Sequence, residues 1–192
     1  MSSFDYRAHG SWNKLANLVG GDYVNAGGSE SVSLRVRGGV IVLHERRVGD
    51  SGPSTRITAS YISRDDFTFS IHSKTPFHRF ANLFGMRHVE VGDSEFDDKF
   101  IVRGNDASRI RSLFANEAIR QKMLCMHSTH WLFVGVTQAE NPGISPLFGG
   151  RYEIVWARAG LVGNTDLLRS IFDLFSEILN QFCEIGSAKE ED

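Results

Sequence analysis

Three side chains that can bind a metal lie close together in the second half of the chain. Cys125, His127 and His130 form the pattern Cys-x-His-x-x-His, and thiolate and imidazole are ligands that zinc prefers. A closed structural site needs a fourth ligand, which Cys183 or His88 could supply. The spacing is looser than in dedicated zinc motifs, so we also keep the simpler prediction that these residues flank a loop without metal.

An acidic cluster earlier in the chain has part of the pattern of a calcium loop. Asp93, Glu95 and Asp97 alternate along the sequence as the first ligands of such a loop do. The pattern then fails, because Asp98 occupies the position of the loop glycine and Gly104 the position of the final glutamate. We therefore predict solvated acids around a strand, with the neighbouring phenylalanines pointing into the core.

Cys125 is also a candidate nucleophile, because a reactive cysteine works with a nearby histidine and His127 follows it closely. A reactive thiol must also be exposed in electropositive surroundings. Cys125 lies between Leu124 and Met126 at the end of an apolar helical pattern, which favours a buried and inert thiol.

Motifs of the main catalytic classes do not occur. The sequence has no G-x-S-x-G elbow, no G-x-G-x-x-G turn and no phosphate-binding loop. The doublets Asp65-Asp66 and Asp97-Asp98 would point to opposite faces of a strand, which argues against general acid–base pairing within either doublet. The sequence favours a function without catalysis or cofactor. The alternative is an enzyme whose site is assembled from distant residues, with His88, His127, His130 and Asp93 as candidates.

Length and composition are those of an ordinary globular protein. With 192 residues, 41% hydrophobic residues and a net charge of −2, we predict one domain over residues 1–186 and a disordered acidic tail over 187–192. Cys125 and Cys183 are expected to be reduced, although one disulfide between them stays an alternative. No secretory signal or membrane span is apparent, so we expect a cytoplasmic protein, with any membrane contact being peripheral.

The pattern of apolar residues predicts the elements that must position these side chains. Alternation predicts strands over 32–36, 57–61 and 67–71, and a continuous apolar run predicts a more buried strand over 40–43. Hairpins should join these strands into a meander with its first turn at Gly38-Gly39. Further strands are expected over 88–91, 100–102, 131–134 and 152–156. Short helices are predicted over 12–19 and 77–84, after Asn105 or Asp106, and after Asn116.

A long C-terminal helix should begin at Asn164 or Thr165 and end at Gly186, because apolar residues recur along one stripe between these points. Runs of strands followed by helices predict an α+β fold. We expect a curved antiparallel sheet whose concave face is covered by this helix, with the short helices inserted.

Two stretches also resemble a known family. Residues 91–106, VGDSEFDDKFIVRGND, followed by IRSLFAN, and residues 179–188, LNQFCEIGSA, are similar to a bacterial family of unknown function with the core VGDxEFDxxFIVxGND and a closing LNQxCxIGSA helix. The resemblance extends over residues 12–188. The family has no established activity, so the resemblance implies no catalytic residue.

Two surfaces are candidates for binding a partner. A set of arginines could gather at one edge of the meander and bind an anion, or simply solvate the sheet: Arg35, Arg37, Arg46, Arg47, Arg56 and Arg64. Because aromatic residues are not interleaved with them and the net charge is −2, the sequence argues against nucleic acid.

The second surface is the segment 77–86, FHRFANLFGM. Phe77, Phe80 and Phe84 share one helical face, with Arg79 and Arg87 nearby. This face could pack on the sheet edge, or it could dock at a membrane interface or in a partner groove. We therefore predict a non-enzymatic domain that binds a protein, a membrane surface or a small apolar ligand. The sequence gives no oligomeric state.

Overall fold

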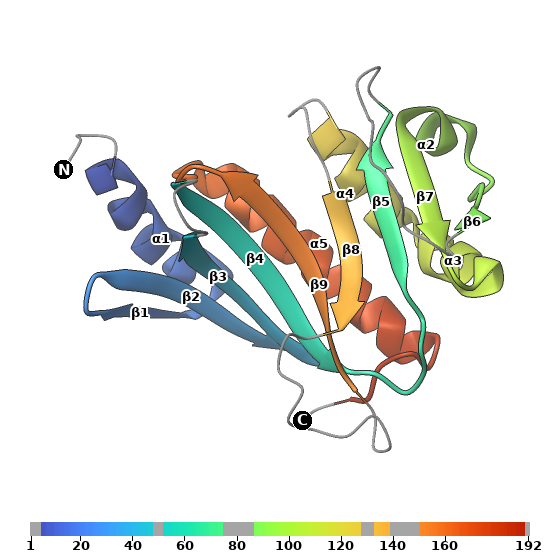
Figure 1. The fold of residues 1–192 in the computed structure, drawn as a ribbon, viewed down its shortest axis with the longest axis horizontal. Coiled ribbons are helices and arrows are strands. Elements are labelled where there is room, and N and C mark those ends of the chain that lie inside the picture. The colour runs from blue at the N-terminus through green and yellow to red at the C-terminus, as the bar shows by residue number, and fades with distance from the viewer. Residues whose placement is uncertain (1–4, 48–51, 75–86, 128–132, 139–149, 191–192) are drawn as a thin grey trace.

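A computed structural model describes residues 5–47, 52–74, 87–127, 133–138 and 150–190. Its strands form one antiparallel sheet in the order β1-β2-β3-β4-β9-β8-β5-β7-β6 (Figure 1). The strands are β1 Asp22–Ala26, β2 Ser29–Val36, β3 Gly39–Arg47, β4 Pro53–Ile62, β5 Phe69–Ser73, β6 Arg87–His88, β7 Phe100–Gly104, β8 Phe133–Gln138 and β9 Arg151–Ala159. The helices are α1 Asp5–Val19, α2 Ser94–Lys99, α3 Ala107–Phe114, α4 Glu117–Met126 and α5 Thr165–Glu184.

The predicted fold class is confirmed. Figure 1 shows α1, α4 and α5 behind a twisted sheet, with α5 running along its middle. The predicted apolar stripe of α5 is buried, and the side chain of Asn164 caps the helix by accepting a hydrogen bond from the backbone of Leu167. Gly186 follows the helix with a φ of 74°, a conformation that glycine adopts without strain.

Aromatic rings fill the space between α5 and the sheet. The ring of Phe182 lies 5.1 Å from that of Tyr61, 5.9 Å from that of Phe67 and 6.2 Å from that of Phe69. Phe69 in turn lies edge-on to Phe114 of α3. These contacts join both halves of the sheet to a single helix, so the core is continuous.

The strand order corrects the predicted meander. β2, β3 and β4 are consecutive neighbours, but β5 does not pair with β4, because β9 and β8 lie between them. The first hairpin also turns at Arg37-Gly38, since Val36 pairs with Gly39. β1 pairs with β2, although no strand was predicted over its residues.

A short helix corrects the prediction for the acidic stretch. Residues 94–99 form α2, and Asp93 caps it by accepting a hydrogen bond from the backbone N–H of Phe96 at 3.1 Å. Phe96 and Phe100 are buried as predicted, with ring centroids 4.8 Å apart. Asp106 and Asn116 cap α3 and α4, also as predicted.

The C-terminal residues correct a third prediction. Ser187 and Ala188 are buried, Ala188 pairs with Ser63, and the backbone N–H of Lys189 donates to the carbonyl of Ile62. The predicted disordered tail is therefore wrong for residues 187–190. Residues 187–190 therefore connect the C-terminal end of α5 to the end of β4 through backbone hydrogen bonds.

Candidate functional site on the open face of the sheet

One face of the sheet faces the helices, and the other face is the candidate site. Ile41 and Leu43 of β3, Ile57 and Tyr61 of β4, and Trp156 of β9 point toward the helices and are fully or almost fully buried. Because side chains alternate along a strand, the residues between them point to the opposite face. We call this opposite face the open face.

The register of the strands places polar side chains of the open face side by side. His44 of β3 pairs with Arg56 of β4, and Ser60 of β4 pairs with Glu153 of β9. Directly paired residues in an antiparallel sheet have Cβ atoms about 5 Å apart, so their side chains can interact. Thr58 lies between Arg56 and Ser60 on the same face.

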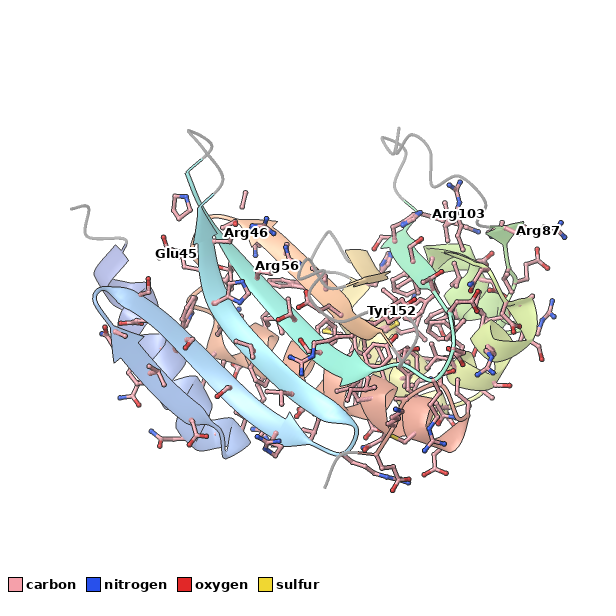
Figure 2. All side chains as sticks on the ribbon, turned by 60° about the horizontal axis from the view of Figure 1, so that its bottom comes forward. Glu45, Arg46, Arg56, Arg87, Arg103 and Tyr152 are labelled. Atoms are coloured by element: carbon pink, nitrogen blue, oxygen red, sulfur yellow. The ribbon has the colours of Figure 1, made fainter. Side chains whose placement is uncertain are left out.

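These side chains line a hollow of about 360 Å³. We call it the arginine hollow and define it by His44, Arg46, Arg56, Thr58 and Glu153. Figure 2 shows Arg46 and Arg56 on the neighbouring strands β3 and β4. Every lining residue lies on a strand at the middle of the sheet, which gives the hollow a rigid base.

One guanidinium and one carboxylate are recessed in the arginine hollow. Nη2 of Arg56 lies 3.5 Å from Oε2 of Glu153, and the two side chains are only 16% and 22% exposed. The hydroxyl of Ser60 donates a hydrogen bond to Oε1 of Glu153 at 3.4 Å. Both contacts are long, so Glu153 retains lone pairs that a ligand could use.

The pKa of the histidine in the arginine hollow is shifted by burial and by the charged residues around it. Burial lowers the pKa of His44 below its usual 6.5, and the cations of Arg56 and Arg46 lower that pKa further, while Glu153 opposes the shift. His44 is therefore neutral at pH 7 and can donate one hydrogen bond and accept another. The guanidiniums are present in full charge at this pH.

Among the described residues of the whole open face, arginines are more numerous than carboxylates. The arginines that the register assigns to this face are Arg35, Arg46, Arg56, Arg103 and Arg151, and the carboxylates are Asp22 and Glu153. Figure 2 shows Arg103 toward the right-hand end of the sheet, near Arg87 and away from Arg46 and Arg56. The excess of arginine favours an anion near the arginine hollow, whereas Ser70 and His72 of β5 and Val155 of β9 on the same face are buried.

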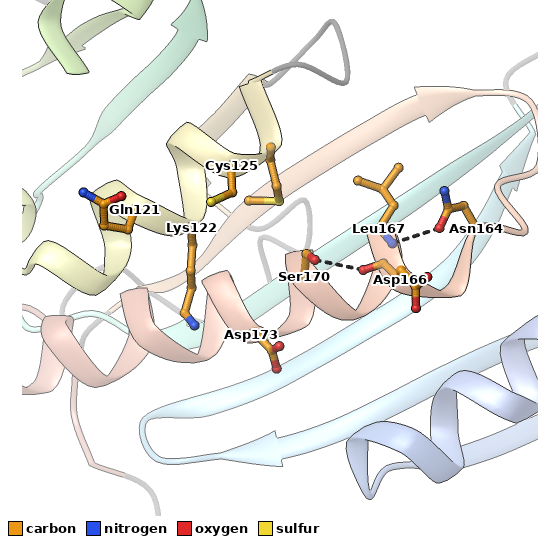
Figure 3. Close-up of a pocket in the computed structure, with 9 residues that line it drawn as sticks. Gln121, Lys122, Cys125, Asn164, Asp166, Leu167, Ser170 and Asp173 are labelled. Carbon is orange, nitrogen blue, oxygen red and sulfur yellow. Dashed lines mark hydrogen bonds between the residues drawn. The ribbon is translucent and has the colours of Figure 1, made fainter. Parts of the chain in front are cut away.

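A second and larger cavity lies between α4 and α5, with a volume of about 510 Å³ (Figure 3). Its polar groups do not converge. Asn164 and Asp166 accept hydrogen bonds from Leu167 and Ser170 of α5 itself, and Lys122 faces the cavity from the other helix. The cavity has no concentration of one charge that would select a ligand.

The predicted zinc ligands do not form a site in the described part of the chain. Cys125 is an exposed free thiol on the rim of the α4–α5 cavity, which corrects the prediction of a buried one. His127 packs edge-on against Phe100, with ring centroids 5.2 Å apart, and His130 lies outside the described residues. No group of three or more His, Cys, Asp or Glu side chains in the described ranges could hold a metal ion. Cys183 is also a free thiol, and burial raises its pKa.

The acidic cluster has structural partners. The carboxylate of Asp97 accepts hydrogen bonds from the backbone N–H groups of Val91 and Gly92, both at 2.9 Å. Asp93 caps α2 and lies 2.9 Å from Nε of Arg120. The pKa of Asp93 is lowered by the hydrogen bond from Phe96 and, to a smaller extent, by Arg120.

The residues of the alternative enzyme site contact different partners. Asp93 interacts with Arg120, His127 packs on Phe100, and His88 is exposed on the edge strand β6. Of the predicted interaction segment, Phe77, Arg79, Phe80 and Phe84 lie outside the described residues. Arg87, which follows them, is exposed at the start of β6.

Sequence reasoning found only part of the arginine hollow. Arg46 and Arg56 were expected at one edge of the meander, whereas His44 and Glu153 were not singled out. His44 follows the apolar Leu43 in a strand, so alternation indicates that the side chain of His44 points away from the core. Nothing local indicates the pairing of Ser60 with Glu153, because 93 residues separate them.

Comparisons with known proteins do not assign the chain to a family. No family model matches the sequence, and no curated protein matches it significantly. Among solved structures the chain is similar to the crystal structure of the mycobacterial trehalose monomycolate transport factor A, TtfA. The alignment covers 93% of each chain at 11% sequence identity, with a TM-score of 0.43. The resemblance to a bacterial family of unknown function stays a prediction.

Proposed function

We propose that this protein is a non-enzymatic binding domain that uses the open face of its sheet to bind an acidic segment of a partner protein. The observation that carries the proposal is the excess of arginine on the open face, centred on the arginine hollow. Guanidinium groups bind carboxylates through two parallel hydrogen bonds, which gives both attraction and orientation.

A small apolar ligand between helix and sheet is less well supported. Such a ligand needs a cavity lined by apolar side chains. The rings of Phe67, Phe69 and Phe182 contact one another there, and Tyr61 packs on Phe182. The interior near α5 is filled by the protein's own aromatic residues.

A flat membrane surface is a poorer match to the open face than a protein segment is. Arg151 is exposed, whereas the side chain of Arg56 is only 16% exposed. A planar bilayer would reach the first and not the second, while a flexible acidic segment can reach both. No helix in the described part of the chain is long and apolar enough to span a membrane. The proposal keeps the cytoplasmic location that the sequence predicts.

The test uses a fluorescently labelled oligo-glutamate peptide as the probe, with binding followed by anisotropy. We expect binding that weakens as salt is raised, and that weakens on the order of tenfold in an Arg46→Gln/Arg56→Gln double variant. Arg169→Gln is the matched control, because Arg169 is an exposed arginine on α5. Thermal melts show whether each variant is folded.

Two outcomes would overturn the proposal. If the double variant and the control bind the peptide equally well, the open face is not the binding surface. Vesicles containing anionic lipid form a second arm of the experiment. If the wild type sediments with vesicles and ignores the peptide, the partner is a membrane rather than an acidic protein.

A further inference from the structure

We propose that the arginine hollow selects a carboxylate over a phosphate dianion, and that Glu153 sets this preference. The inference rests on the proposed function, since it concerns which acidic group enters that same site. A partner would then be recognised by aspartate, glutamate or a free chain end rather than by phosphorylated residues.

The first argument is the local charge. The arginine hollow contains two guanidiniums, on Arg46 and Arg56, and one carboxylate, on Glu153. A ligand anion in the hollow therefore lies beside the negative charge of Glu153. A phosphorylated residue carries about −1.5 to −2 at pH 7, so Glu153 repels it more strongly than it repels a carboxylate with a single charge. Screening by water is reduced there, because Arg56 and Glu153 are both mostly buried.

The position of Glu153 is the second argument. Its two oxygens are held by Ser60 at 3.4 Å and by Arg56 at 3.5 Å, so the carboxylate stays at the wall of the hollow. A ligand carboxylate bound to Arg56 would lie next to it. Repulsion between the two is smallest when the ligand also brings a hydrogen-bond donor, which Glu153 can accept.

A peptide supplies both groups together. The backbone N–H of an acidic residue lies a few bonds from its own carboxylate, so one residue can present an anion to the arginines and a donor to Glu153. Thr58 and neutral His44 add hydrogen-bonding groups at the base of the hollow. The site thus combines an anion-binding part with an acceptor, as expected for recognition of an acidic peptide.

The experiment compares two probes that differ at one residue. One is the oligo-glutamate peptide, and the other is the same peptide with its central glutamate replaced by phosphoserine. For the wild type we expect tighter binding of the glutamate peptide. In Glu153→Gln, which keeps the shape and the contact with Ser60, the ratio of affinities should shift toward the phosphopeptide by on the order of tenfold.

Glu117→Gln is the matched control, because it makes the same substitution at an exposed glutamate of α4 that does not line the arginine hollow. Its ratio of affinities should stay near that of the wild type. If Glu153→Gln leaves the ratio unchanged, or if the wild type prefers the phosphopeptide, the inference is wrong. The proposed function survives that result as long as binding of either peptide still depends on Arg46 and Arg56. It fails separately if neither peptide needs these arginines.

Discussion

Nη1 of Arg109 on α3 lies 2.7 Å from Oδ2 of Asp65, which precedes β5, and 2.7 Å from Oγ of Ser187, which follows α5. One guanidinium thereby joins three segments that are far apart in the sequence. Asp65 also accepts a hydrogen bond from the backbone N–H of Phe67, so it orients the entry to β5. The ion pair between Arg109 and Asp65 connects the two halves of the structure near the C-terminal end of α5.

Replacing Arg109 should therefore destabilise the protein. Arg109→Met keeps the aliphatic part of the side chain and leaves the carboxylate of Asp65, which is only 18% exposed, without its cation. We expect a loss of about 1–3 kcal/mol in the free energy of unfolding, measured by denaturant titration. Arg169→Met is the control, because Arg169 and Asp173 are more than half exposed and 3.9 Å apart. That variant should change stability by less than about 0.5 kcal/mol. Equal effects would show that the contacts of Arg109 add nothing.

Removing an aromatic ring from the core beside α2 should lower the free energy of unfolding more than replacing Arg109 does. Phe96 and Phe100 are fully or almost fully buried, and Phe96 also packs on Phe114 at 5.3 Å. Phe100→Ala should lower the free energy of unfolding by about 3–5 kcal/mol, because it leaves a cavity. Leu18→Ala, at a residue that is 44% exposed, serves as the comparison and should have a small effect. A thermal melt of Phe100→Ala that matches the wild type would contradict the role given to this ring.

Calcium should not stabilise the protein through the acidic cluster. The carboxylate of Asp97 binds two backbone N–H groups, and that of Asp93 caps α2 and pairs with Arg120. Millimolar calcium should leave the melting temperature unchanged, since a ligand raises stability only if it binds the folded state. A rise that depends on calcium concentration and disappears in Asp97→Asn would make this cluster a cation site after all.

Stability should depend on pH through His44. Its pKa in the folded protein is below 6.5, so the unfolded chain binds a proton first as the pH falls. This linkage makes the wild type lose stability from about pH 7 toward about pH 5. His44→Asn removes the group, and its stability should fall less over the same range. The difference between the two curves is the measured quantity, because other titrating groups contribute to both. Parallel curves would show that His44 is not perturbed.

How far the sequence predicted this structure depends on the range of the interactions. The caps at Asp106, Asn116 and Asn164 and the stripe of α5 were predicted, because each depends on residues within a few positions. The insertion of β9 and β8 next to β4 was not predicted, because strand order depends on pairing between distant segments. Residues 94–99 were missed as a helix because their three acids around the buried Phe96 also fit a strand.

The same difference between local and long-range interactions explains which residues of the candidate site were predicted. Arg46 and Arg56 were predicted only as members of a set of arginines that could gather at one edge of the meander. Their meeting with Glu153 requires the pairing of β4 with β9, which no local pattern encodes. The exposure of Cys125 was mispredicted for a related reason, because its apolar neighbours on α4 face the core and the thiol faces the α4–α5 cavity.

The position of β9 also has a consequence for the newly synthesised chain. The second edge of β4 can pair only after β9 has been synthesised. Glu153, the partner of Ser60, lies 93 residues downstream. At translation rates of about 5–20 residues per second, one edge of the hairpin sheet stays open for about 5–20 s on the ribosome. An open edge of this length can pair with other chains. The yield of the protein in a cell should then depend on translation speed and chaperone supply as much as on the stability of the finished fold.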